Sequence, residues 1–236
     1  MDQVIVAAHV CFFAPLVGSL LSWFCQYFLE DNYAHAVAIT GVLCAWVASM
    51  FLAFAFVVEA RPAVDYVLYT WLAIPGYTVQ IGYVLDALST SMLTVVSGVS
   101  LMVYIYSVGY MAYEQGYARF FAWMSLFSFM MINLVIARDV VQLFAGWEGV
   151  GLVSYWLIGF YYKKPSAADG GLKAFLLNRV GDMGFILGIA ATYYVFSSTE
   201  VGFITAQSPM MVDKLILGYP ALSFIALSWF IGAMGK

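Results

Sequence analysis

Seven long apolar stretches constrain the fold of this chain more than any other feature of its sequence. A helix needs about 20 mostly apolar residues to cross the hydrocarbon core of a bilayer, and each stretch approaches or exceeds that length. The stretches run from Val4 to Leu29, His35 to Val58, Leu85 to Tyr110, Phe120 to Ala137, Val140 to Tyr162, Leu172 to Phe196, and Leu215 to the end. The sequence therefore predicts an all-α polytopic membrane protein with about seven transmembrane helices.

The composition agrees with a membrane location and argues against a soluble protein. Only 9% of the 236 residues are charged and 64% are hydrophobic, whereas a soluble domain carries about 25% charged residues. So few charges could not cover a soluble surface of this size. The net charge of −4 comes without a basic stripe, which argues against nucleic acid as a partner and leaves the lipid bilayer as the expected surroundings.

Short polar clusters separate the apolar stretches, the first of them at Glu30-Asp31-Asn32. Residues Ala63 to Val84 alternate aromatic and β-branched side chains around Pro75-Gly76, which predicts a short extended hairpin between the second and third helices, outside the bilayer. An interfacial helix is expected within Ser197–Lys214. Residues 1–236 are predicted to form a single transmembrane helical domain.

Glu148 is the charged residue whose position in a predicted transmembrane helix is hardest to explain. It lies about eight residues, or roughly 12 Å of helical rise, into the fifth stretch. That places it near the middle of a hydrocarbon core about 30 Å thick. An ionised carboxylate there is costly unless it is paired, hydrated or protonated. We interpret Glu148 as a proton carrier; the alternative is a neutral acid bonded to a neighbouring helix.

Arg179 and Asp182 lie three residues apart on one face of the sixth stretch, so they are expected to form a local ion pair. Such a pair serves helix packing, or it acts as a switch in which Arg179 moves to another acid when a proton arrives; the sequence leaves both open. Gly184-x-x-x-Gly188 in the same stretch predicts a close helix approach.

Lys236 ends the sequence directly after Gly232-Ala233-Met234-Gly235, inside an apolar run. Because natural chains seldom stop within a hydrophobic segment, we expect the sequence to be an N-terminal fragment. Lys236 would then be a membrane-embedded lysine that completes a proton relay with Glu148; the alternative is an interfacial anchor. Charges at the ends of the stretches, such as Asp86 and Asp139, are expected to lie at the interface.

The sequence lacks the motifs of cofactor-binding subunits. It has no glycine-rich nucleotide loop, and its three cysteines, Cys11, Cys25 and Cys44, lie apart in apolar runs without paired spacing. We interpret the cysteines as packing residues. No redox centre, metal or nucleotide is therefore expected in this chain.

An ordered series of motifs resembles one family, the largest antiporter-like subunit of the proton-pumping NADH:quinone oxidoreductase (complex I). This subunit is chain L in bacteria and chain 5 in mitochondria. The motifs extend over roughly Tyr83 to Lys236, whereas the first two stretches match only in character. They are Phe144 to Phe160 around Glu148, Tyr106 to Met111 with Arg119-Phe-Phe121, Lys173-Ala-Phe175, Asn178 to Asp182, and Gly232 to Lys236.

The resemblance implies a membrane subunit of an enzyme, which carries part of a proton path coupled to quinone reduction. It implies that Glu148 works with Lys236 in a proton half-channel, and that Asp182 and Arg179 belong to the same charge network. NADH, flavin, iron–sulfur clusters and quinone would bind in other subunits. The implied partners are other complex I membrane subunits, especially the neighbouring antiporter-like subunit.

The resemblance also implies a bacterial inner membrane or, alternatively, a mitochondrial inner membrane. Family members continue past the lysine, so the first half-channel is expected to be incomplete after Lys236. Two other functions stay open at this point: a subunit of a multisubunit sodium/proton antiporter, and a non-catalytic assembly fragment.

Overall fold

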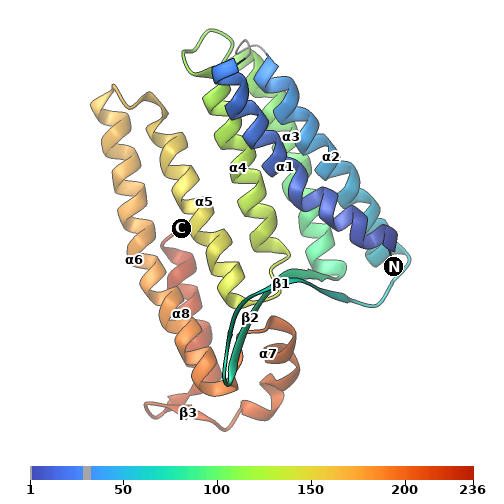
Figure 1. Cartoon of the computed structure of the whole chain (residues 1–236). Coiled ribbons are helices and arrows are strands. Elements are labelled where there is room, and N and C mark those ends of the chain that lie inside the picture. Colours follow the sequence, from blue (N-terminus) through green and yellow to red (C-terminus); the bar gives the residue numbers. More distant parts are fainter. Residues whose placement is uncertain (1, 29–32) are drawn as a thin grey trace. The chain divides into compact units, whose positions relative to one another are not determined.

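A computed structural model describes residues 2–28 and 33–236 (Figure 1). The expected polar break at Glu30-Asp31-Asn32 and the expected helix end at Leu29 lie outside the described residues. The chain divides into two compact units, Met1–Tyr66 with Tyr83–Ile136, and Val67–Gly82 with Ala137–Lys236. Each unit is described by itself, and the single domain expected from the sequence stays a prediction.

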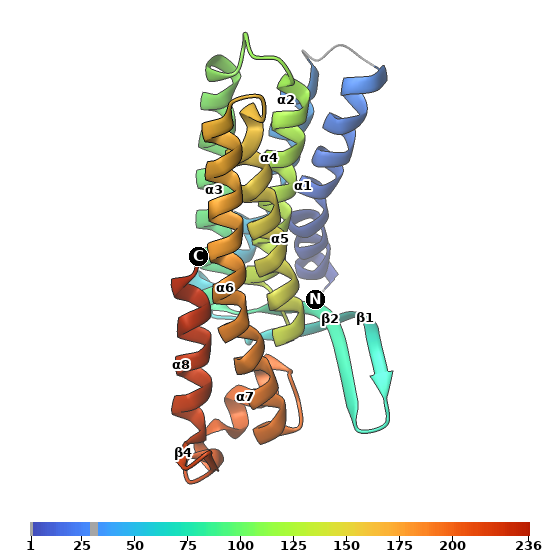
Figure 2. The ribbon, with the colours of Figure 1, turned by 90° about the vertical axis from the view of Figure 1, so that its left-hand side faces the viewer.

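In the described part of the first unit, four helices lie side by side (Figures 1 and 2). They are α1 (Asp2–Phe28), α2 (Ala34–Ala53, continued by a π-helical turn at Phe54–Val58), α3 (Ala87–Tyr110) and α4 (Tyr117–Val135). α1 and α2 pack closely, since a Cβ on Gly41 would lie 2.8 Å from the carbonyl oxygen of Ala14. α3 begins at a capping box, in which Asp86 and Ser89 each accept a hydrogen bond from the backbone N–H of the other.

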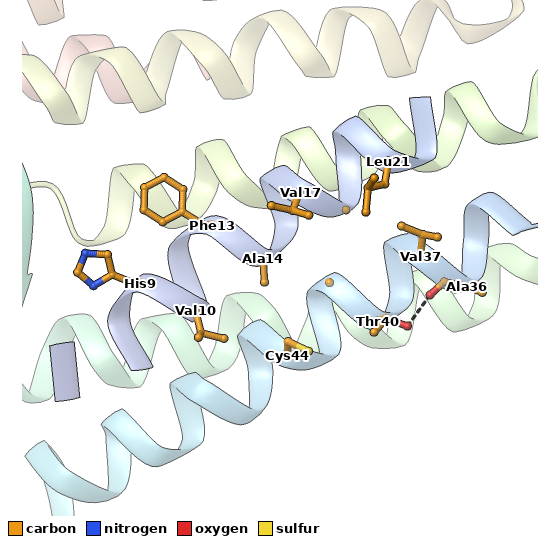
Figure 3. Close-up of a pocket in the computed structure, with 12 residues that line it drawn as sticks. His9, Val10, Phe13, Ala14, Val17, Leu21, Ala36, Val37, Thr40 and Cys44 are labelled. Carbon is orange, nitrogen blue, oxygen red and sulfur yellow. Dashed lines mark hydrogen bonds between the residues drawn. The ribbon is translucent and has the colours of Figure 1, made fainter. Parts of the chain in front are cut away.

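An apolar groove of about 740 Å³ lies between α1 and α2 (Figure 3). His9 stands at one end of it, and side chains such as Val10 and Val17 line it. Its polar side chains are satisfied locally: Thr40 donates to the carbonyl of Ala36, and the ring of His9 bonds to a carbonyl of its own helix. The groove is thus an apolar surface of the first unit.

The second unit holds the remaining helices. They are α5 (Val140–Ile158, followed by a 3₁₀ turn at Gly159–Tyr161), α6 (Pro165–Phe196), α7 (Val201–Gln207, followed by a 3₁₀ turn at Ser208–Met211) and α8 (Ala221–Met234). α6 and α8 lie side by side (Figures 1 and 2). α7 confirms the helix expected in that segment, and its position at a membrane interface stays a prediction.

Strands β1 (Val64–Ile74) and β2 (Tyr77–Leu85) confirm the hairpin expected around Pro75-Gly76 (Figure 2). Proline fixes the first turn position and Gly76 takes a φ of +85° at the second, as a type II turn requires. The observed hairpin, Val64–Leu85, agrees with the expected bounds Ala63–Val84 to within one residue at each end.

The all-α polytopic fold is confirmed. In the described ranges, six helices are long and apolar enough to cross a membrane. The region of the seventh predicted span differs at its start: β3 (Leu215–Ile216) and β4 (Tyr219–Pro220) pair around a turn in which Leu217 and Gly218 both have positive φ. α8 therefore has 14 residues, or about 21 Å of helical rise.

Candidate functional site

Glu148 forms an ion pair with a residue of the neighbouring helix. It lies in α5, and its Oε1 accepts a hydrogen bond from Nη1 of Arg179 in α6 at 2.5 Å. The side chain of Glu148 is half-buried, 24% exposed. This half-buried acid therefore has a cationic partner, which reduces the cost of keeping it inside a membrane helix.

Asp182 bonds to α5 as well, and this corrects the local Arg179–Asp182 pair that the spacing suggested. Asp182 is 2% exposed, and its Oδ1 accepts a hydrogen bond from the indole Nε1 of Trp147 at 2.9 Å. Residues three apart in a helix differ by about 60° around its axis. Asp182 accordingly faces Trp147, while the longer side chain of Arg179 reaches Glu148.

Lys236 joins the same group from the end of α8. Its Nζ donates a hydrogen bond to the backbone carbonyl of Trp147 at 2.7 Å and lies 4.9 Å from the centroid of the Trp147 ring. Glycines bring α8 this close to α6, because a Cβ on Gly181 would lie 2.8 Å from the Cα of Gly235. Gly184 confirms the expected close helix approach, since its Cβ would lie 2.9 Å from Ile231.

The four charged residues predicted from the sequence thus belong to one cluster, to which α5, α6 and the end of α8 contribute. Arg179, Asp182 and Lys236 all interact electrostatically with Glu148. With two acids and two bases, the formal charges in their ordinary ionised states sum to zero. A balanced cluster of this kind can accept, exchange and release a proton through changes in pairing.

Two residues of this site were missed by the sequence reasoning. Trp147 contacts both Asp182 and Lys236. Gly151 provides the space for the ammonium, since a Cβ there would lie 2.6 Å from Lys236 Nζ. Their spacing could have indicated a shared role, because Trp147 and Gly151 are four residues apart and therefore lie on the same face of α5.

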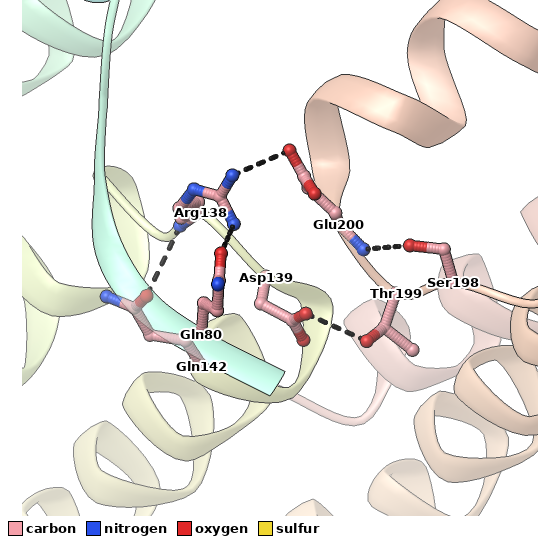
Figure 4. A network of polar contacts seen from close by, with 7 residues as sticks. All are labelled: Gln80, Arg138, Asp139, Gln142, Ser198, Thr199 and Glu200. Carbon is pink, nitrogen blue, oxygen red and sulfur yellow. Dashed lines mark hydrogen bonds and ion pairs between the residues drawn. The ribbon is translucent and has the colours of Figure 1, made fainter. Parts of the chain in front are cut away.

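A second polar network lies in this unit and was not expected (Figure 4). Arg138 is 9% exposed; it donates from Nη1 to Gln80 of the hairpin and from Nη2 to Glu200 before α7, both at 2.8 Å. Glu200 and Asp139 form an isolated antiparallel bridge. No local pattern predicts these contacts, since the partners of Arg138 are about 60 residues away in sequence.

Asp139, expected to lie at the membrane interface, is buried within the protein at 1% exposed, and its position relative to a membrane stays a prediction. Its Oδ1 caps α5 by accepting from the N–H of Val141, and its Oδ2 accepts from the Thr199 hydroxyl, each at 2.8 Å. Burial raises the pKa of Asp139 above its ordinary value, although these hydrogen bonds and Arg138 act in the opposite direction. The cap fixes the residue at which α5 begins, and this start sets the position of Glu148 in the helix.

Comparisons with known proteins point to one family. Residues 71–121 match the family described as NADH-ubiquinone oxidoreductase (complex I), chain 5 N-terminus. Residues 137–236 match the NADH:quinone oxidoreductase/Mrp antiporter transmembrane family. The chain is 43% identical to NADH-quinone oxidoreductase subunit L of Neisseria meningitidis serogroup B, over 94% of this chain and 34% of that protein. It is 37% identical to chain 5 of Chondrus crispus, over 95% and 34% respectively.

Solved structures share the fold. The Mrp complex from a Dietzia species aligns with a TM-score of 0.72 at 22% identity, over 98% of this chain and 23% of that chain. An archaeal membrane-bound sulfane sulfur reductase aligns with a TM-score of 0.74 at 14% identity, over 97% and 43% respectively. Both likenesses show the fold alone.

The chain spans about a third of the length of the curated relatives it matches. The two family matches together cover more than half of its residues, and the two curated relatives are named NADH-quinone oxidoreductase subunit L and NADH-ubiquinone oxidoreductase chain 5. This integral membrane chain belongs to the subunit L (chain 5) family of antiporter-like NADH:quinone oxidoreductase subunits.

Proposed function

We propose that this chain carries the first part of a proton path in a membrane subunit of complex I, and that quinone reduction elsewhere in the complex drives the proton movement. The observation that carries the proposal is the cluster in which Arg179 holds Glu148 while Asp182 and Lys236 are both bonded to Trp147. Charges are expensive within membrane helices, and they persist there mainly on ion and proton pathways.

The pairing of the cluster suggests how a proton moves. When Glu148 takes up a proton it becomes neutral, and the attraction that holds Arg179 disappears. Arg179 is then free to move toward Asp182, and the added positive charge favours loss of the Lys236 proton. A carboxyl group and an amine thus alternate as proton acceptor and donor, and the helices stay in place.

The redox chemistry is assigned to other subunits. NADH, flavin, iron–sulfur clusters and quinone are proposed to bind outside this chain, since its sequence carries none of their motifs. The proposed partners are complex I membrane subunits, with the neighbouring antiporter-like subunit foremost. The proposed location is a bacterial inner membrane or a mitochondrial inner membrane.

A subunit of a multisubunit sodium/proton antiporter is the second candidate, because the matching transmembrane family also includes Mrp antiporters. Purification of the native complex distinguishes the two functions. NADH-oxidising subunits that co-purify with the chain support complex I. Sodium-dependent proton exchange by a complex without those subunits supports the antiporter.

Replacement of Glu148 by Gln tests the proton path, because the amide cannot carry a proton between partners. In the complete subunit within the assembled complex, we expect Glu148→Gln to lower the rate of proton pumping by about tenfold or more. The measurement is proton uptake and NADH oxidation in proteoliposomes, normalised to the amount of assembled complex.

The matched control is Glu114→Gln, which alters an exposed acid in the loop between α3 and α4. The control is expected to pump as the wild type does. Unchanged pumping by Glu148→Gln would contradict the proposed proton path and would favour a role of the cluster in assembly alone.

A further inference from the structure

Trp147 contacts one acid and one base of the charge cluster, Asp182 and Lys236, through different atoms. Its indole N–H donates to Oδ1 of Asp182 at 2.9 Å, and its backbone carbonyl accepts from Nζ of Lys236 at 2.7 Å. The Lys236 ammonium also lies over the indole ring, 4.9 Å from its centroid, where the negative face of the ring attracts a cation. Trp147 therefore links two groups that come from different helices.

The indole ring is held in place by aromatic packing. Trp147 packs against Phe185 of α6 with ring centroids 5.4 Å apart, and Phe185 is 6% exposed. Phe185 also stacks with Trp229 of α8, with ring centroids 6.1 Å apart and an interplanar angle of 10°. A side chain fixed by packing can hold a reacting group at a defined position.

The indole N–H is a donor only, and this has a chemical consequence for Asp182. Because Oδ1 is engaged by the donor, a proton arriving at this carboxylate is directed to Oδ2. Transfer from Lys236 would convert the ammonium to an amine and the carboxylate to a carboxylic acid, so the total charge of the pair does not change. The hydrogen bond from Trp147 survives the transfer.

We infer that Trp147 is the positioning residue that orients Asp182 and Lys236 for proton exchange, with Oδ2 of Asp182 as the oxygen that takes the proton. The inference rests on the proposed proton path. It adds to that path Trp147, a residue whose side chain does not ionise. Trp147 acts through its neighbours, so its loss should alter coupling more than assembly.

Two matched tryptophans provide the test. Trp147→Phe removes the indole N–H and keeps both the aromatic ring and the backbone carbonyl that holds Lys236. Trp229→Phe makes the same change at a second indole that stacks with Phe185, where the buried indole nitrogen has no hydrogen-bond partner among the described residues. The readout is the number of protons pumped per NADH oxidised by the assembled complex in proteoliposomes.

We expect Trp147→Phe to lower this ratio by at least about twofold, because a hydrogen bond to a charged group is lost, while Trp229→Phe keeps the wild-type ratio. A purely structural role would instead reduce the amount of assembled complex and leave the ratio unchanged. Equal ratios in the two variants would overturn the inference.

A double-mutant cycle identifies the group through which Trp147 acts. In an Asp182→Leu background the acceptor of the indole N–H is gone, so adding Trp147→Phe should cause no further loss of pumping; a further loss equal to that in the wild-type background contradicts the inference. Glu148→Gln separates the two proposals. If it abolishes pumping while Trp147→Phe has no effect, the proton path stands and the role of Trp147 fails.

Discussion

Gly151 leaves the space in which the ammonium of Lys236 lies, one helical turn after Trp147. A Cβ at this position would lie 2.6 Å from Nζ, which is too close, and the flexible lysine rather than the backbone would move. Alanine is also about 1 kcal/mol better than glycine inside a helix. The Gly151→Ala change should therefore displace the ammonium of Lys236 while it stabilises the helix.

We predict that Gly151→Ala lowers proton pumping severalfold while the thermal stability of the complex stays the same or rises. Pumping in proteoliposomes and the unfolding temperature measure the two effects. Gly170→Ala is the control, because a Cβ there meets only an ordinary contact with Ile158 at 3.9 Å. A loss of stability without a loss of pumping in Gly151→Ala would show that Gly151 serves packing and not the position of Lys236.

The charged residues of this site were predictable from the sequence, but their partners were not. The cost of burying charge singled out Glu148, Arg179, Asp182 and Lys236, and all four lie in one cluster. Which acid Arg179 binds depends on how α5 and α6 are rotated against each other, and the nearly uniform apolar character of the two helices does not encode that rotation. Trp147 was missed for a related reason, since tryptophan in an apolar helix usually serves packing.

At the scale of single elements, the position of Glu148 depends on where α5 begins. Asp139 caps this helix and is also bonded to Thr199. We predict that Asp139→Ala lowers the stability of the complex by about 1–2 kcal/mol, because alanine cannot cap. Asp139→Asn should cost less, since asparagine is an equally good cap and places no charge in a buried site. Thermal unfolding of the purified complex measures whether Asp139→Asn is more stable than Asp139→Ala.

The pH dependence of these variants follows from the pKa of Asp139. Burial raises that pKa above the ordinary value of 3.8, so the folded state binds a proton more readily than the unfolded state. Ionisation of Asp139 therefore lowers stability as the pH rises from 3.8 through the folded-state pKa. Over this pH range, Asp139→Asn should gain stability relative to the wild type as the pH rises. The opposite trend would mean that the hydrogen bonds to Asp139 outweigh its burial.

Elements with a local signal were predictable as well. Hydrophobic length gave the long helices, and Pro75-Gly76 gave the turn of the β1–β2 hairpin. The segment from Leu215 to Pro220 was misjudged because its apolar residues continue those of α8. The positive φ at Leu217 and Gly218 allows a tight hairpin turn. Leucine is not typical of such a turn position, so the sequence did not predict the turn.

On the scale of the whole molecule, contacts between segments far apart in sequence organise the second unit. Arg138 connects the hairpin to the start of α7 through Gln80 and Glu200 (Figure 4). The side chains of the Arg138–Glu200 pair are 11% and 34% exposed. The Arg61–Glu59 pair has the same 2.8 Å separation, but its side chains are 44% and 42% exposed. The two pairs have the same separation, and they differ in burial and in the sequence distance between the partners, which is 2 residues for Arg61–Glu59 and 62 for Arg138–Glu200.

We predict that Arg138→Gln loosens the part of β2 around Gln80 and the start of α7 together, at a cost of about 1–3 kcal/mol, because partly buried acceptors lose a charged donor. Amide hydrogen exchange should become at least about tenfold faster in residues of both segments. Arg61→Gln should change exchange little, since an exposed ion pair contributes about 0–1 kcal/mol. If only one of the two segments exchanges faster in Arg138→Gln, Arg138 does not couple them. The residues that Arg138 contacts are not members of the Glu148 cluster. We therefore expect proton pumping per NADH to be less affected than hydrogen exchange, and that result would assign Arg138 to the stability of the fold rather than to the proton path.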